Sequence, residues 1–332
     1  MRIGLAYDLK SAVPLDTADP EDALEEYDSR ETVEIIAAAL SAAGHSVVML
    51  GGGEEFLENI LREKVDFIFN IAEGRGNSRS RESQVPSVLE MLGIPFTGSD
   101  SHCLTVCLDK PLAKRLVAAE GVNTPRWQLV NDEIELGNVA WERFPAIVKP
   151  AYEGSSKGIR LTSVVDNVEQ LWQEASRLLN DYRQPVMIEE FINGDEVTVG
   201  VVGNLPTRVI GMMRILPRKR GERFVYSLKV KRDYLNLVNY ESPPQLDDKI
   251  LAELSAASLK IFKCSGCRDF ARIDFRLSPE GAPYFLEINP LPGLGIYSDL
   301  VIMARKMGWA HQGLIQAVFE AARKRCSPCV AV

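Results

Sequence analysis

The sequence has few histidines, no excess of basic charge and no long apolar run, and each absence excludes a class of protein. Only three histidines occur in 332 residues, so catalysis by a histidine-based triad is not expected. The formal net charge of −8 argues against a nucleic-acid or anionic-membrane surface. No apolar run reaches the roughly 18 residues of a membrane span. Asp8 and Lys10 interrupt the first apolar segment too early for a signal peptide. We expect a cytoplasmic protein without nucleic-acid or membrane partners.

Cysteine is also scarce, with six residues in the chain. Cys264 and Cys267 form one C-x-x-C pair, and Cys326 and Cys329 form another. Two such pairs can hold a structural zinc ion, although these two lie far apart in the sequence. A disulfide or redox role for the second pair is a further alternative. The favoured interpretation is that the cysteines are reduced and mostly structural.

Strand-like and helix-like segments alternate over the first hundred residues. Apolar patterning predicts strands at 2–9, 46–50, 65–71 and 94–99, and helices at 29–45, 54–64 and 82–93. Asp28 and Glu31 have the spacing of a capping box for the first of these helices, and Gly44 supplies its C-terminal stop. Such alternation predicts a doubly wound, largely parallel sheet, in a domain at 1–105.

The rest of the chain is richer in β-structure and predicts two further domains, at 106–190 and 191–332. Helices are expected at 108–121, 167–180 and 249–264, and strands at 144–150, 185–192, 196–203, 207–216, 270–277 and 283–289. The fold class is therefore α/β, changing to α+β in the C-terminal part.

The last two strands, joined by the turn at 278–282, carry polar residues within apolar segments. Residues two apart in a strand face the same way, so Arg272 and Asp274 share one face, as do Glu287 and Asn289. Antiparallel pairing can bring these four side chains together. Carboxylate and amide oxygens suit magnesium rather than zinc. The alternative is a solvent-facing surface that carries an Asp–Arg pair.

The middle of the chain offers groups that can hold a phosphate. Lys149 ends an apolar strand, and Glu153–Gly158 ("EGSSKG") is a small, flexible loop whose backbone N–H groups can approach phosphate oxygens, with Lys157 adding charge. The alternative is an ordinary loop. Glu189 and Glu190 end another strand and, with Glu196, can accept hydrogen bonds from adenine or ribose. They can equally be solvated hinge residues.

The order "LDK … IVKP-EGSSKG … IEEF … ARID … LEINPLPGL" resembles the ATP-grasp superfamily and, within it, the D-alanine–D-alanine ligase family. The likeness runs from Phe69 to about Ala304. It implies an ATP-grasp fold of three domains and an ADP-forming ligase that joins two amino acids through an acyl phosphate, as in peptidoglycan synthesis. It also implies ATP, two Mg²⁺ ions (with Mn²⁺ as a possible substitute) and a homodimer.

The resemblance also implies roles for individual residues. ATP would be contacted by Lys110, Lys149, Glu153, Gly154, Ser155, Ser156, Lys157, Glu189, Glu190, Ile192, Glu196 and Lys231. The magnesium ions would be held by Asp274, Glu287 and Asn289. Catalytic roles would belong to Arg272, Ser155 and Lys231. The amino-acid substrates would be contacted by Glu25, Glu73, Arg232, Arg272, Gly293 and Ser298, with Glu26 or Glu31 as alternatives to Glu25.

Two residues depart from the family pattern around the first amino acid. Glu73 stands where the family has histidine, and Arg232 stands where it has tyrosine. One hypothesis is that Arg232 and Lys229 suit an acidic or larger carboxylate donor. Alternatives are a ligase for another amino-acid or dipeptide pair, and an ATP-grasp phosphotransferase with no amine acceptor. A catalytically silent nucleotide-binding protein is disfavoured, because the lysine and metal-ligand set is complete.

Overall fold

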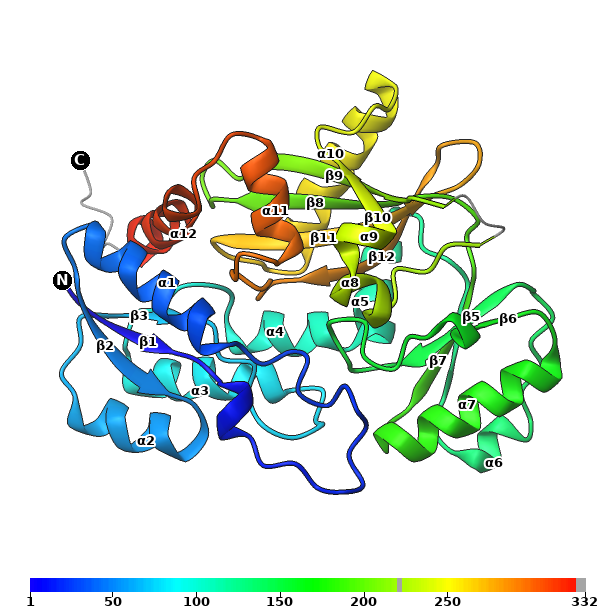
Figure 1. Ribbon diagram of the computed structural model, residues 1–332, viewed down its shortest axis with the longest axis horizontal. Helices are drawn as coiled ribbons and strands as arrows, with labels where there is room; N and C mark the ends of the chain where they lie inside the picture. Colours follow the sequence, from blue (N-terminus) through cyan, green and yellow to red (C-terminus); the bar gives the residue numbers. More distant parts are fainter. Residues whose placement is uncertain (220–222, 327–332) are drawn as a thin grey trace.

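The N-terminal part of the protein is a three-layer α/β unit (Figure 1). The computed structural model describes residues 1–219 and 223–326. Three parallel strands lie in the order β2-β1-β3, with bounds β1 (Arg2–Ala6), β2 (Ser46–Gly51) and β3 (Phe67–Asn70). The helices that cover the sheet are α1 (Arg30–Ala42), α2 (Gly53–Arg62), α3 (Gln84–Leu92) and α12 (His311–Cys326).

Both faces of this sheet are apolar. Ile3 and Leu5 of β1 pack in one cluster with residues of α1 and α12. Ala6 and Ile68 pack in another with residues of α2 and α3. A parallel strand buried on both faces reads as a continuous hydrophobic run, which explains the pattern at positions 3–6 and 67–69. The prediction of a doubly wound sheet is confirmed.

Several local predictions for this part were wrong in detail. Helix α1 is capped by Ser29, whose Oγ accepts from the backbone N–H of Thr32 (3.2 Å), and not by Asp28. Ser29 is the better placed residue because it directly precedes the first helical residue. The strand expected at 94–99 is reduced to an isolated bridge between Ile68 and Phe96. Helix α4 (Ser101–Leu108) and strand β4 (Trp127–Val130) were not predicted.

The middle of the chain forms a four-stranded sheet in the order β4-β7-β5-β6, with β5 (Ala146–Pro150), β6 (Val164–Val165) and β7 (Val186–Glu190). Helices α6 (Glu133–Leu136) and α7 (Val168–Tyr182) accompany it. Figure 1 shows this unit, in green, beside the N-terminal unit and the third sheet. Helices α4 and α5 (Lys110–Ala119) cross the centre of the molecule between these units.

The third sheet has five antiparallel strands in the order β10-β9-β8-β11-β12. Their bounds are β8 (Glu196–Val202), β9 (Arg208–Pro217), β10 (Val238–Glu241), β11 (Phe270–Leu277) and β12 (Pro283–Asn289). The associated helices are α8 (Leu228–Arg232), α9 (Tyr234–Leu237), α10 (Asp248–Cys264) and α11 (Asp299–Lys306). Short 3₁₀ turns are η1 (Lys10–Ala12), η2 (Arg81–Ser83) and η3 (Leu161–Ser163).

The two faces of the third sheet differ in chemistry. Val197, Val199 and Val201 of β8 pack against apolar residues of α10. The opposite face carries Thr198, Arg272 and Asp274, and this face looks toward the middle sheet and the site described below. The three sheets match the expected three-part organisation, while the domain boundaries at 105 and 190 stay predictions. No helix in the described ranges is long and apolar enough to cross a membrane.

Candidate active site

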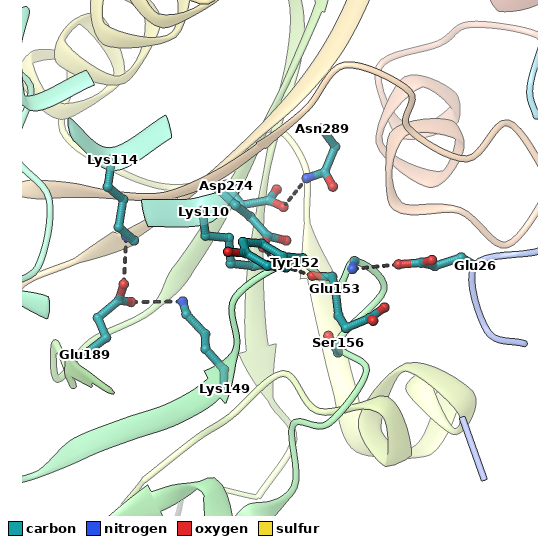
Figure 2. Close-up of polar contacts among 12 residues, drawn as sticks. Glu26, Lys110, Lys114, Lys149, Tyr152, Glu153, Ser156, Glu189, Asp274 and Asn289 are labelled. Carbon is teal, nitrogen blue, oxygen red and sulfur yellow. Dashed lines mark hydrogen bonds and ion pairs between the residues drawn. The ribbon is translucent and has the colours of Figure 1, made fainter. Parts of the chain in front are cut away.

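The β11–β12 hairpin brings its four polar residues together. In the antiparallel register, Arg272 is opposite Asn289 and Asp274 is opposite Glu287. Asn289 donates from Nδ2 to Asp274 Oδ2 at 3.2 Å (Figure 2). The predicted convergence is confirmed. It arises because each strand alternates its faces and the short turn fixes the pairing.

Arg272 lies between two acidic residues on this face. Its Nη2 is 2.8 Å from Asp274 Oδ2, and its Nη1 is 3.9 Å from Asp299 Oδ2 at the start of α11. Burial lowers the pKa of an arginine, but Asp274 and Asp299 overcome that effect and hold the pKa of Arg272 above its ordinary value. A permanently charged guanidinium therefore faces the site beside the carboxylates.

The donor set on the hairpin fits magnesium. Asp274, Glu287 and Asn289 offer only hard oxygen ligands. Burial would raise the pKa of Glu287, but the nearby charges of Lys110, Lys149 and Arg272 lower it to about 2, so its carboxylate is ionised at neutral pH. These residues could hold the divalent ions that the sequence predicts.

A group of buried lysines faces these carboxylates. Lys149 lies 3.0 Å from Glu189 Oε1, and Lys114 lies 2.8 Å from Glu189 Oε2 (Figure 2). Lys110, the first residue of α5, reaches Glu287 at 3.6 Å and donates to the carbonyl of Glu153. Glu189, predicted to read adenine, is thus shared by two ammonium groups.

Lys114 was missed by the sequence analysis. It is fully buried, and desolvation lowers its pKa to about 8, against the opposing attraction of Glu189. The sequence could have indicated Lys114, because Lys110 and Lys114 are four residues apart in "KPLAK" and so lie on the same face of the helix.

Seven of the twelve predicted ATP residues line one cavity between the middle and third sheets, with a volume of about 80 Å³: Lys149, Ser156, Glu189, Glu190, Ile192, Glu196 and Lys231. The predicted metal ligands Asp274 and Glu287 line it as well. Apolar walls come from Ile147, Ile159, Phe191 and Leu286. Outside its lining are the other five predicted ATP residues, Lys110, Glu153, Gly154, Ser155 and Lys157.

The Glu153–Gly158 loop is bonded to the N-terminal unit. Its Gly154 N–H donates to Glu26 Oε1 at 2.6 Å, and its Gly158 N–H donates to Asp22 Oδ2 at 2.9 Å. Lys157, expected to add charge for a phosphate, pairs instead with Glu153 and Glu26. Phosphate binding by Lys157 or by the Gly154 N–H would require these contacts to open.

Glu26 and Arg81 organise this junction, and neither role was predicted. Arg81 Nη2 lies 2.7 Å from Glu26 Oε1 and 3.2 Å from Glu153 Oε2, and all three side chains are almost completely buried. Burial would raise the pKa of Glu26, but Arg81 and Lys157 lower it to about 2. Glu26 is thus an ion-pair partner of Arg81 and Lys157, and it also lines the cavity described next, so it stays an alternative to Glu25 for binding a substrate ammonium.

A second, larger cavity of about 320 Å³ lies beside the hairpin, on the side of the N-terminal unit. Its lining includes the predicted substrate residues Glu25, Glu73, Arg272, Gly293 and Ser298, together with Ser155 and Asn289. Gly293 allows a close approach here, because a Cβ at this position would lie 2.8 Å from Ser298 Oγ. Arg272 lines both cavities, whereas Asp274 lines only the first and Asn289 only the second, so the hairpin lies between them. The two are called below the nucleotide-side cavity and the substrate-side cavity, after the predicted residues that line each.

Arg232 is the predicted substrate residue that the cavity lining omits. Its guanidinium pairs with Glu25 at 2.5 Å and is half exposed. Lys229 is exposed and also outside the lining. The hypothesis that these two cations select an acidic donor has no support from their positions.

The comparisons with known proteins agree with this geometry. A family model described as "D-ala D-ala ligase C-terminus" matches residues 115–320. A D-alanine–D-alanine ligase of Aquifex aeolicus is 36% identical over 87% of this chain and 94% of its own. The chain belongs to the D-alanine–D-alanine ligase family. As a member, it is an ATP-dependent ligase with the ATP-grasp fold, as the sequence predicted.

Solved structures extend the likeness in fold to the whole chain. The D-alanine–D-alanine ligase of Bacillus anthracis complexed with ATP has a TM-score of 0.72 at 23% identity, covering 98% of each chain. The VanG D-Ala:D-Ser ligase of Enterococcus faecalis also has a TM-score of 0.72, at 21% identity, covering 97% of this chain and 99% of its own.

The substrate-side cavity is acidic. Glu73, Glu82 and Asp28 line it, and within residues 1–219 and 223–326 their side chains make no hydrogen bond or ion pair. Burial raises the pKa of Asp28 to about 7 and that of Glu82 to about 8. Burial, together with Glu82 and Glu26, holds the pKa of Glu73 well above its ordinary value. A bound cationic group would compensate these carboxyls.

Substituting Glu82 with glutamine should change the pH dependence of stability. The pKa of Glu82 is about 8 in the folded protein, against 4.5 ordinarily. Between pH 4.5 and pH 8, Glu82 is protonated in the folded protein and ionised in the unfolded chain. The unfolding free energy of the wild type therefore falls as the pH rises. The unfolding free energy of E82Q minus that of the wild type should therefore grow by at least about 1 kcal/mol from pH 5 to pH 9. Urea denaturation at both pH values measures it.

The matched control is Glu58→Gln, because Glu58 is exposed on α2. Its difference from the wild type should stay constant with pH. A constant difference for E82Q as well would show that Glu82 ionises normally in the folded protein.

Proposed function

We propose that the protein joins two amino acids in two steps, with D-alanine as the first substrate to test in both positions. The carboxylate of the first amino acid attacks the γ-phosphorus of ATP, and the bond to the β-phosphate oxygen breaks, releasing ADP. The amine of the second amino acid then attacks the acyl carbon, and inorganic phosphate leaves as the amine loses a proton. The observation that carries the proposal is that the metal-ligand hairpin and Arg272 lie between two cavities.

The residues of the nucleotide-side cavity would position the triphosphate. Lys149 and Lys231 line this cavity, and Lys110 lies outside its lining, 3.6 Å from Glu287. All three lysines place positive charge near Glu287, so they can neutralise phosphate oxygens during transfer. Glu190, Ile192 and Glu196 lie at the end of the cavity formed by β7 and β8, where they would contact adenine and ribose. The two magnesium ions, with Mn²⁺ as a substitute, would be held by Asp274, Glu287 and Asn289 and would neutralise the charge of the transferred phosphoryl group.

The residues of the substrate-side cavity would orient the reacting groups. Arg272 is the permanent cation in its wall beside the hairpin, so it would stabilise the oxyanion of the tetrahedral intermediate. Ser298 and Gly293 would hold the carboxylate of the second amino acid. Ser155, with φ 51°, lies in the same wall and would contact the first amino acid.

The test is ADP release with Mg²⁺ and ATP against D- and L-amino acids, alone and in pairs. A ligase releases ADP in proportion to dipeptide, and both products should require two amino acids or one amino acid in both roles. ADP release that needs no amine would instead support a phosphotransferase. A D-serine acceptor belongs in the panel because a structural neighbour is described as a D-Ala:D-Ser ligase.

The acidic lining makes a further prediction about the panel. At pH 9, where Asp28 and Glu82 with pKa values of about 7 and 8 are ionised, D-aspartate and D-glutamate should be poor donors. Their kcat/KM should be at least about 100-fold below that of D-alanine, because like charges placed together cost several kcal/mol. Glu82→Gln should narrow this difference, since it removes one ionised carboxyl from the cavity. Acidic donors that match D-alanine in the wild type would contradict the role assigned to this lining.

The homodimer stays a prediction that follows from the family resemblance, and the cytoplasmic location stays a prediction from the composition of the sequence. Multi-angle light scattering of the full chain measures the oligomeric state directly. A mass near 36.9 kDa would indicate a monomer, and twice that mass the dimer.

A further inference from the structure

Three buried cysteines from distant parts of the chain meet outside the two cavities. Cys103 and Cys107 lie one turn apart on α4, and Cys267 lies between α10 and β11. The Sγ atoms of Cys103 and Cys107 are 3.8 Å apart, and those of Cys103 and Cys267 are 3.5 Å apart. All three sulfurs lie within 4.8 Å of one another. The proposed ligase reaction uses none of them.

This grouping differs from the pairing that the sequence suggested. Cys264 has its Sγ 3.4 Å from the carbonyl of Ile261 on its own helix and does not join the cluster. Cys329 lies outside the described residues, so the alternative of a zinc site formed by both C-x-x-C pairs is not tested. Cys267 instead joins two cysteines that are more than 150 residues earlier in the chain.

The sulfur positions match those required by a bound metal ion. Metal–thiolate bonds of about 2.3 Å place tetrahedral sulfurs about 3.8 Å apart and trigonal sulfurs about 4.0 Å apart. The observed separations of 3.8 Å and 3.5 Å are close to these values without any rearrangement of α4. Thiolates favour soft or borderline ions such as Cu⁺ and Zn²⁺ over Mg²⁺.

The surroundings of the three cysteines also suit a metal ion. All three side chains are buried. A cation bound by the three sulfurs would displace thiol protons and neutralise thiolate charge in an apolar surrounding.

We propose that Cys103, Cys107 and Cys267 bind one thiophilic d¹⁰ metal ion, Zn²⁺ or Cu⁺. The ion joins α4 to the turn that precedes β11. Helix α4 leads directly into Lys110 at the start of α5, and β11 carries Arg272 and Asp274. Metal binding therefore connects two segments that supply active-site residues from opposite ends of the sequence. Cys107 also lines a small cavity together with Lys110 and Glu287.

The test uses the full chain, reduced, freed of metal and kept without oxygen. Titration with Cd²⁺, a spectroscopic substitute for Zn²⁺, is followed by the ultraviolet thiolate-to-metal absorbance. Titration with Cu⁺ against a coloured competing chelator forms the second arm. The expected result is one equivalent of tight binding in at least one arm, release of protons and a higher thermal midpoint. The arm that gives tighter binding identifies the ion.

Cysteine variants separate this site from other thiols. Cys103→Ser, Cys107→Ser and Cys267→Ser should each weaken binding at least tenfold, whereas the matched control Cys264→Ser should bind like the wild type. The wild-type titration decides the question even if a variant fails to fold. Absence of stoichiometric binding in both arms overturns the proposal, as does equal loss in Cys264→Ser. A Cys103–Cys267 disulfide, with no metal binding after its reduction, overturns it as well.

Discussion

Replacing Asp274 with asparagine, or Glu287 with glutamine, should lower ADP-forming turnover by about 10³-fold or more. These carboxylates lie opposite each other on β11 and β12 and face Lys110 and Arg272. Each substitution removes one negative oxygen ligand while keeping the size of the side chain. The loss should appear in kcat and in the dependence of rate on Mg²⁺ concentration, because the metal-ligand set is weakened and the amino-acid cavity is preserved.

The control for this pair is Glu280→Gln in the turn of the same hairpin. Glu280 is exposed and far from the paired carboxylates, so this variant should retain wild-type turnover. Excess Mg²⁺ should restore part of the activity of D274N or E287Q. Full activity of both variants at low Mg²⁺ would show that the hairpin does not bind the metal, and the proposed function would then lose its main support.

Replacing Arg81 with methionine should destabilise the protein by about 3–5 kcal/mol at pH 7. Arg81 is 1% exposed and bridges Glu26 and Glu153, and its Nη1 also donates to the carbonyl of Tyr152 at 2.8 Å. Without the guanidinium, Lys157 alone faces both buried carboxylates. The measurement is the midpoint of urea denaturation, which should fall markedly.

The contacts of Arg81 also predict how the loss of stability in R81M depends on pH and on a second substitution. Arg81 and Lys157 hold the pKa of Glu26 at about 2 in the folded wild type. That contribution to stability is present above the ordinary carboxyl pKa of 4.5 and is lost as pH falls toward 2. The difference in unfolding free energy between the wild type and R81M should therefore become smaller as the pH falls below 4.5. Adding Glu26→Gln to R81M should recover part of the loss at pH 7.

The matched control is Arg79→Met, two residues earlier. The side chain of Arg79 is 58% exposed, and its partner Asp109 keeps a hydrogen bond from the Leu112 N–H, so the loss of Arg79 should cost at most about 1 kcal/mol. If R81M were as stable as R79M, the buried ion-pair network would not hold the Glu153–Gly158 loop against the N-terminal unit.

The strands and the hairpin were predictable because their patterns are local. The alternation in "ARIDF" and "FLEIN" determines which side chains share a face. The short turn between the strands fixes the register in which they pair. The same holds for Lys149, which ends an apolar strand. Helix α4 was not predicted, because its sequence "SHCLTVCL" is short and apolar on most sides, so period alone does not distinguish it from a buried strand.

The partners of charged residues were much harder to predict. Lys157 looked like a phosphate ligand from its place in a Gly/Ser loop, yet it pairs with Glu153 and Glu26. Arg232 looked like a substrate contact, yet it pairs with Glu25, 207 residues earlier. Charge attraction depends on the distance between two groups in the folded protein. Their separation along the sequence therefore does not show which groups will pair.

The amino-acid sequence by itself determined the α/β and α+β character, the family, the metal-ligand hairpin and most of the nucleotide cavity. These features depend on strand alternation and on short motifs whose residues are neighbours in the chain. Only the tertiary structure decided that Lys114 shares Glu189 with Lys149, that Arg81 and Glu26 fasten the loop, and that Cys267 meets Cys103 and Cys107. Those contacts join segments that are distant in the sequence, and folding alone brings them within bonding distance.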